Sequence, residues 1–126
     1  MSRAQQFADA LQQLERDRDL DAFLERFADD VRLFRPEAGG QESGVEGARR
    51  FWQAYLDQFE EIGSTFDRVV DADALGELEW VGSGRLSSGR PVSYAGVSLL
   101  EHDDAGKVVR FATYYDTAAF TTPTAD

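Results

Sequence analysis

Apolar residues in the first half of the chain recur every three or four positions, which is the period of an amphipathic helix. Three helices are predicted, with apolar faces made by Phe7, Leu11 and Leu14, by Leu20, Phe23, Leu24 and Phe27, and by Phe51, Trp52, Tyr55, Leu56 and Phe59. Ser2, Asp19 and Ser43 precede these helices, and each has a short polar side chain that can cap free backbone N–H groups.

Outside the three predicted helices, the chain has the residue composition of β-strands and turns. Residues 31–35 form a short extended run that Pro36 ends, and the glycine-rich residues 37–44 are interpreted as a loop. After Gly63, β-branched and aromatic residues predict four strands separated by turn residues, at 65–70, 75–85, 91–101 and 108–115. Short links between consecutive strands require antiparallel hairpins. The order α-α-β-α-β-β-β-β therefore predicts an α+β domain.

Length and charge exclude several classes of protein. The 126 residues predict a single domain over 1–120, with a frayed tail at 121–126. A net charge of −11 disfavours nucleic acid and anionic membrane partners, and no apolar stretch is long enough to cross a bilayer. The chain has no cysteine and one histidine, so thiolate chemistry and a multi-histidine metal site are excluded. No phosphate-cradling glycine motif is present, so we expect no cofactor. The N-terminus does not resemble a secretory signal, so we expect a cytoplasmic location.

Several short sequence segments occur in an order that resembles the order found in a known superfamily. They lie at residues 19–31, 47–52, 106–110 and 114–116. From about residue 4 to residue 120, the chain resembles the nuclear transport factor 2-like superfamily, in particular its SnoaL-like polyketide-cyclase and ketosteroid-isomerase-like branches. This resemblance implies a cone-shaped, strongly curved sheet wrapped around the helices. It also implies an apolar cavity at the wide end and a dimer.

The catalytic residues of these relatives are replaced at the positions that match them. Arg35 stands where ketosteroid isomerases have a general-base Asp, just before the proline that ends the first strand. Ser98 and Leu11 match their oxyanion-stabilising Asp and Tyr. Thr113 matches an acid/base of the polyketide cyclases, and threonine is a poor proton acceptor at neutral pH. The proton shuttle of these enzymes is therefore not recognisable in this chain.

Eight residues are predicted to bind a ligand, because they combine aromatic faces with polar ends in elements that face the expected cavity. They are Arg35, Trp52, Tyr55, Tyr94, Ser98, Phe111, Thr113 and Tyr115. Alternation along the last two strands assigns the last five to the inner face of the sheet. Arg35 is interpreted either as an inward guanidinium for an anionic or carbonyl group or as a rim residue paired with an acid.

The outer face of the sheet is expected to be covered by a second subunit. Val97 and Leu99 fall on this face, and an exposed apolar surface favours a homodimer. In strand 75–85, the cost of burying an unpaired carboxylate places Glu79 outside and Leu78 and Trp80 inside. Alignment with the related enzymes suggests the opposite register, with Glu79 inside and Leu78 and Trp80 outside.

Three functions remain open, and the first is our leading hypothesis: an aromatic-lined cavity that binds a small apolar or aromatic molecule. The second is a cofactor-independent isomerase, cyclase or hydratase. It would use Asp116 as acid/base and Arg35 or a tyrosine to stabilise an oxyanion. Asp116 has an alternative role, because it can cap the short turn at 117–120. The third is a dimerisation or interaction module whose cavity is filled by its own rings.

Overall fold

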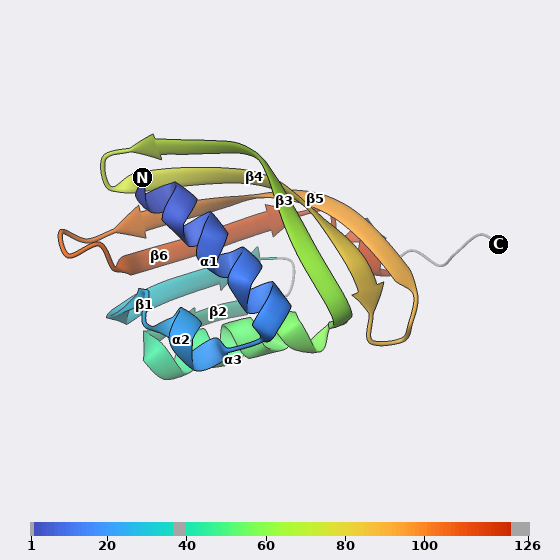
Figure 1. Cartoon of the computed structure of the whole chain (residues 1–126). Helices are drawn as coiled ribbons and strands as arrows, with labels where there is room; N and C mark the ends of the chain where they lie inside the picture. Colours follow the sequence, from blue (N-terminus) through green and yellow to red (C-terminus); the bar gives the residue numbers. More distant parts are fainter. Residues whose placement is uncertain (1, 37–39, 122–126) are drawn as a thin grey trace.

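The computed structural model describes residues 2–36 and 40–121. In chain order its elements are α1 (Arg3–Asp17), α2 (Leu20–Leu24), β1 (Phe27–Arg35), β2 (Gly40–Ser43), α3 (Gly44–Asp57), β3 (Phe59–Ala72), β4 (Leu75–Leu86), β5 (Pro91–His102), β6 (Val108–Tyr115) and α4 (Ala118–Thr121). The predicted α+β class is confirmed (Figure 1). No helix within this part of the chain is long and apolar enough to span a membrane.

One mixed sheet forms the body of the molecule, with strand order β2-β1-β6-β5-β4-β3. Strands β1 and β6 pair in parallel, and every other neighbouring pair is antiparallel. The sheet curls without closing, and α1 crosses its concave side (Figure 1). This curl leaves an interior that α1, α3 and the inner faces of the strands share.

Two of the three predicted helix caps are present. The Ser2 hydroxyl accepts the N–H of Gln5 at 3.1 Å, and the Asp19 carboxylate accepts the N–H of Ala22 at 3.2 Å. Ser43 is the N-cap residue of α3, but its side chain makes no capping hydrogen bond, so that prediction was wrong. Ser43 is still part of β2, where it pairs with Arg32, and this pairing sets its conformation.

The boundaries of three elements differ from the sequence prediction. The predicted loop at 37–44 contains β2, which forms a hairpin with β1, although residues 37–39 lie outside the described part. The third helix ends at Asp57, and Phe59 opens β3 instead of continuing the helix. β3 pairs with β4 along its whole length and is therefore far longer than the predicted 65–70. Of the predicted tail, Thr121 ends α4, and residues 122–126 are outside the description.

In β4 the apolar side chains face the interior and the carboxylates face outward, as expected from the cost of burying an unpaired carboxylate. Leu78 is fully buried and Trp80 is 9% exposed, whereas Glu77 and Glu79 are only partly buried on the opposite face. The register suggested by charge is therefore confirmed, and the reverse one is wrong. Burial of Trp80 matters for function, because it turns the indole toward the space under α1.

Candidate functional site

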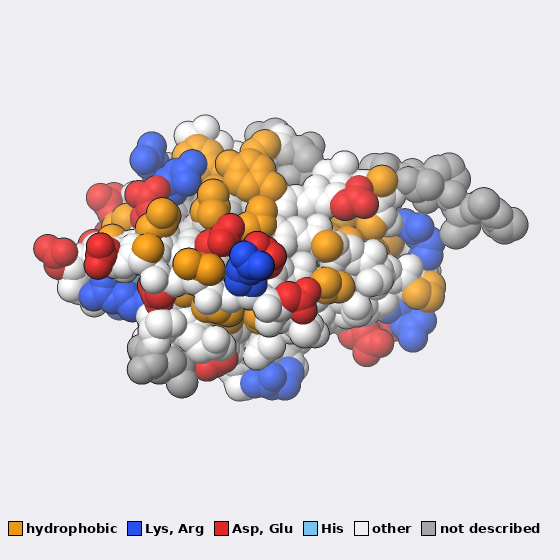
Figure 2. Space-filling model, turned by 90° about the horizontal axis from the view of Figure 1, so that it is seen from above, with side chains coloured by type: hydrophobic (Ala, Val, Ile, Leu, Met, Phe, Trp, Pro, Cys, Tyr) orange, Lys and Arg blue, Asp and Glu red, His pale blue; other side chains and the backbone are white. Residues whose placement is uncertain are grey.

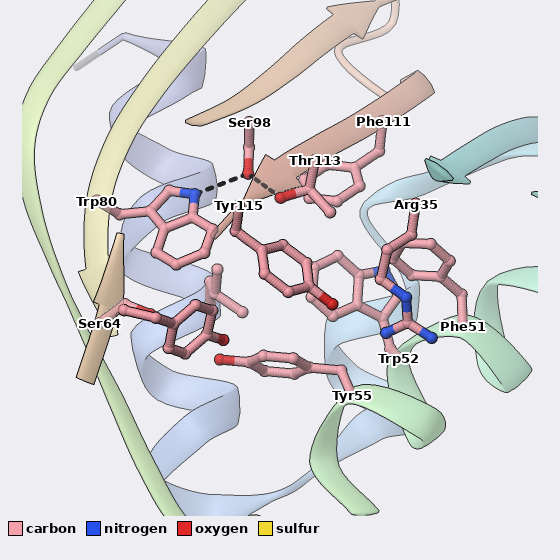
Figure 3. A pocket seen from close by; sticks show the side chains of 12 residues that line it. Arg35, Phe51, Trp52, Tyr55, Ser64, Trp80, Ser98, Phe111, Thr113 and Tyr115 are labelled. Carbon is pink, nitrogen blue, oxygen red and sulfur yellow. Dashed lines mark hydrogen bonds between the residues drawn. The ribbon is translucent and has the colours of Figure 1, made fainter. Parts of the chain in front are cut away.

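A narrow cavity lies between α1, α3 and the concave face of the sheet (Figure 3). Its volume is about 40 Å³, which is room for a few water molecules. Its walls contain all eight residues predicted from the sequence, which are Arg35, Trp52, Tyr55, Tyr94, Ser98, Phe111, Thr113 and Tyr115. The structure therefore brings them together around one space, while ligand binding by them stays a prediction.

Aromatic rings form most of the wall and pack against one another. The Trp52 ring centroid lies 5.0 Å from that of Phe111 and 5.7 Å from that of Tyr55. On the other side, Tyr94 lies 5.2 Å from Trp80 and 5.3 Å from Tyr115. All four pairs are edge-to-face or tilted, as aromatic quadrupoles favour. The rings interlock, yet they leave a void between them.

A chain of hydrogen bonds runs along the sheet side of the cavity. Trp80 Nε1 donates to Ser98 Oγ at 2.9 Å, and Ser98 Oγ lies 2.9 Å from Thr113 Oγ1 (Figure 3). One hydroxyl donates to the other, so one hydroxyl hydrogen of the pair is left for another acceptor. Ser98 and Thr113 are both buried, and they therefore supply a donor at an otherwise apolar wall.

Two further donors reach the cavity from β1 and α3. The guanidinium carbon of Arg35 lies 5.2 Å from the centroid of the Phe51 ring, which is a cation–π contact. Trp52 is 3% exposed, and its Nε1 has no hydrogen-bond partner among residues 2–36 and 40–121. A buried N–H without a partner costs stability, and an acceptor atom of a ligand in the cavity would remove that cost.

The sequence analysis missed a buried carboxylate next to the cavity. Glu15 is 7% exposed, and its Oε2 accepts hydrogen bonds from the hydroxyls of Tyr55 at 2.6 Å and Ser64 at 2.7 Å. Its Oε1 accepts the Ser64 backbone N–H at 2.9 Å. Burial raises the pKa of Glu15, and these hydrogen bonds oppose the rise. Burial also raises the pKa of Tyr55 well above its usual range.

Four other lining residues were not predicted as ligand contacts: Leu11, Phe51, Ser64 and Trp80. Glu15 had a signal in the sequence, because it lies four residues after Leu11 on the apolar stripe of α1. A charged residue on such a stripe must find buried partners. Ser64 had none, because only the packing of β3 against α1 brings it to the cavity.

Asp116 does not line the cavity. It is exposed just after β6, and its Oδ1 accepts the N–H of Ala118 at 3.0 Å. Asp116 therefore makes the contact of a turn cap, which is the alternative role considered for it. A part in acid/base chemistry stays a prediction without support from this geometry. Among the described residues, no cluster of His, Asp and Glu could hold a metal ion.

Known proteins of similar sequence or structure share the fold of this chain. The model of the SnoaL-like domain matches residues 4–111. An NTF2-like protein from Anabaena variabilis superposes with a TM-score of 0.82 at 20% identity, over 93% of this chain and 89% of its own. No protein in a search of curated sequences matches the chain.

Two similar structures hold small molecules. RV0760c from Mycobacterium tuberculosis, in complex with estradiol-17beta-hemisuccinate, has a TM-score of 0.77 at 16% identity and covers 94% of this chain and 98% of its own. TerC, co-crystallised with polyporic acid, has a TM-score of 0.78 at 19% identity and covers 94% and 95%. At these identities the similarity is one of fold.

Proposed function

Since this chain belongs to the SnoaL-like domain family, we propose that its cavity binds a small, flat and largely apolar or aromatic molecule. The observation that carries this proposal is a wall of aromatic rings interrupted by a few buried polar atoms. Small-molecule sites have this composition, in which apolar faces supply affinity and a few polar groups set orientation. The ligand complexes of RV0760c and TerC support the same use of this fold.

A ligand of this kind needs more room than the cavity holds at rest, because ligand pockets commonly measure about 300–1,000 Å³. The half-buried rings of Tyr115 and Phe120 are the candidates to move. Phe120 lies in the short helix α4, with its centroid 4.7 Å from that of Tyr94. Arg90 holds this helix by donating to the carbonyl of Ala119 at 3.2 Å. Displacement of Phe120 would open the end of the cavity while the rings around Trp52 stay packed.

Polar contacts to the ligand would come from five of the predicted residues, which carry either a hydroxyl group or a guanidinium group. These residues are Arg35, Tyr55, Tyr94, Ser98 and Thr113. The Ser98 and Thr113 pair offers a hydroxyl donor, and Arg35 offers a cation for an oxygen-bearing or anionic group. Such a site orients a flat molecule between its rings.

Filling the cavity should weaken ligand binding. Leu11→Phe adds a ring from α1 into a void of about 40 Å³, so we expect the affinity for 2-naphthol to fall at least about tenfold. Isothermal titration calorimetry measures the affinity. Gln13→Phe adds the same ring at an exposed position of α1 and should bind like the unmodified protein. Equal binding by Leu11→Phe and Gln13→Phe would show that the probe lies elsewhere.

A homodimer through the outer sheet face is part of the same proposal. Tyr114 is 43% exposed on this face. It lines a shallow groove together with apolar residues and three carboxylates, which include Val81, Ala95, Val97, Asp67, Glu77 and Glu79. On the face seen from above in Figure 2, hydrophobic side chains are interspersed with acidic and basic ones. Apolar side chains exposed on a sheet face, such as Tyr114 and Val97, favour association.

Sedimentation should therefore report about twice the chain mass of 14.0 kDa at micromolar concentration. Val97→Glu places a charge in the groove and should shift the protein to the single-chain mass. Val70→Glu is the matched control, because Val70 is 41% exposed on β3 and does not line the groove. A single-chain mass for the unmodified protein would refute the dimer.

A further inference from the structure

The buried carboxylate of Glu15 determines which hydrogen-bonding atoms the α3 and β3 side of the cavity presents. Both hydroxyl groups on this side, those of Tyr55 and Ser64, donate their only hydrogen to Glu15 Oε2. The Ser64 backbone N–H donates to Glu15 Oε1, so each carboxylate oxygen has at least one donor. A hydroxyl that has donated its hydrogen can only accept further hydrogen bonds. The lone pairs of Tyr55 and Ser64 therefore remain for a ligand, since both residues line the cavity.

We propose that this side of the cavity is a subsite for a hydrogen-bond donor and that the ligand carries a phenol-type or enol-type hydroxyl. This inference rests on the proposed binding function and narrows it to a chemical class. Glu15 is a positioning residue, because it does not line the cavity and acts through Tyr55 and Ser64. A carbonyl oxygen placed against Tyr55 and Ser64 would meet their oxygen lone pairs, because both hydroxyl hydrogens are donated to Glu15.

Within residues 2–36 and 40–121, the one charged side chain that acts on Glu15 comes from its own helix. Glu15 lies on α1, its bonded partners come from α3 and β3, and Arg16 is the nearby cation that stabilises its charged form. Tyr94 on β5 faces Tyr55, and a phenol stays neutral at acid and neutral pH. Glu15 is therefore the group whose protonation changes the direction of these hydrogen bonds.

Protonation of Glu15 changes the subsite from one that only accepts hydrogen bonds to one that can donate one. A hydrogen on Oε2 would donate to one of the two hydroxyls, which lie 2.6 and 2.7 Å away. That hydroxyl would then turn its own hydrogen toward the cavity and become a donor. Burial raises the pKa of Glu15, so the change occurs above the ordinary range of a glutamate. Donor selectivity is thus present above this pKa and is lost as the pH falls through it.

Glu15→Gln reproduces the protonated state at neutral pH. The Ser64 N–H needs an acceptor at the position of Oε1, so the glutamine oxygen takes that place and its amide nitrogen replaces Oε2. The amide then donates to the hydroxyl oxygens of Tyr55 and Ser64. Their hydrogens become available to the cavity, which favours a ligand that accepts.

The test compares three flat probes of similar size by isothermal titration calorimetry: 2-naphthol, 2-methylnaphthalene and 2-naphthaldehyde. At neutral pH, 2-naphthol should bind at least about tenfold more tightly than 2-naphthaldehyde, because the aldehyde leaves buried polar groups unpaired. In Glu15→Gln the ratio should fall to about one or below. Asp17→Asn removes an exposed carboxylate of the same helix and should keep the full ratio.

The outcomes separate this inference from the function on which it rests. If none of the three probes binds, the proposed small-molecule site is wrong. If all bind and the unmodified protein does not favour 2-naphthol, or if Glu15→Gln keeps that preference, the donor subsite is wrong. The unmodified protein gives a second measurement that does not depend on folding of a variant. Its preference for 2-naphthol should decline as the pH is lowered from 7 toward 4.5, and a constant ratio would also overturn the inference.

Discussion

Replacing Trp52 with alanine is expected to lower the free energy of unfolding by about 3–5 kcal/mol, the largest loss for a single substitution proposed for this chain. The indole is 3% exposed and lies at the centre of the aromatic core. Its ring centroid is 5.0 Å from those of both Phe23 and Phe111 and 5.4 Å from that of Phe51. These rings come from separate elements, so they cannot collapse together into the space that alanine leaves. Urea denaturation followed by circular dichroism measures the change.

Two other variants serve as controls for Trp52→Ala. Gln53→Ala changes an exposed neighbour on α3 and should alter stability by no more than about 0.5 kcal/mol. Trp52→Phe keeps most of the ring volume and removes the N–H that has no partner in the described part of the chain. It should therefore be less destabilising than Trp52→Ala. A loss below about 1 kcal/mol for Trp52→Ala would show that the core is looser than this packing implies.

Replacing Gly96 with alanine is expected to disturb both the sheet and the cavity. A Cβ at this position would lie 2.5 Å from Cζ2 of Trp80 and 2.6 Å from the carbonyl oxygen of Tyr114. The carbonyl belongs to β6 and cannot move without breaking the pairing of β5 and β6, so overpacking should cost about 1–3 kcal/mol. Trp80 would also leave its place and lose its hydrogen bond to Ser98. We expect the affinity for 2-naphthol to fall at least about tenfold.

Gly63→Ala is the matched control for this variant. Gly63 is an exposed position of β3, and a Cβ there would meet no atom within 4 Å. Alanine at a compatible position reduces the freedom of the unfolded chain, so stability should stay level or rise slightly. Thermal unfolding and calorimetry measure both variants. If Gly96→Ala kept the stability and affinity of Gly63→Ala, Trp80 would not be held where the structure places it.

Much of the candidate site could be predicted from periodicity, because the faces of helices and strands follow from local geometry. Alternation along β5 and β6 placed Tyr94, Ser98, Phe111, Thr113 and Tyr115 on one side of the sheet, and all five line the cavity. Charge decided the register of β4 correctly, since carboxylates avoid unpaired burial. Fold class and the order of the main elements were predictable for the same reason.

Features that depend on pairing between distant segments were not predictable. β2 is polar and four residues long, so only its hairpin with β1 defines it as a strand. β3 extends to Phe59 because β4 offers a partner there, and no local pattern separates that residue from the preceding helix. The width of the cavity also depends on the tertiary structure, since its lining residues come from α1, α3 and five strands that are distant in the sequence.

By itself, the sequence determined which side of each element is apolar, and so which residues surround the interior. Only the tertiary structure decided which polar atoms meet there. The bonds from Tyr55 and Ser64 to Glu15 join residues 40 and 49 positions apart in the chain. Hydrogen bonds form only when donor and acceptor lie within about 3 Å, and no periodic pattern specifies a distance that short between separate elements. The faces are therefore local properties of the chain, whereas the hydrogen-bonding character of the cavity is a property of the fold.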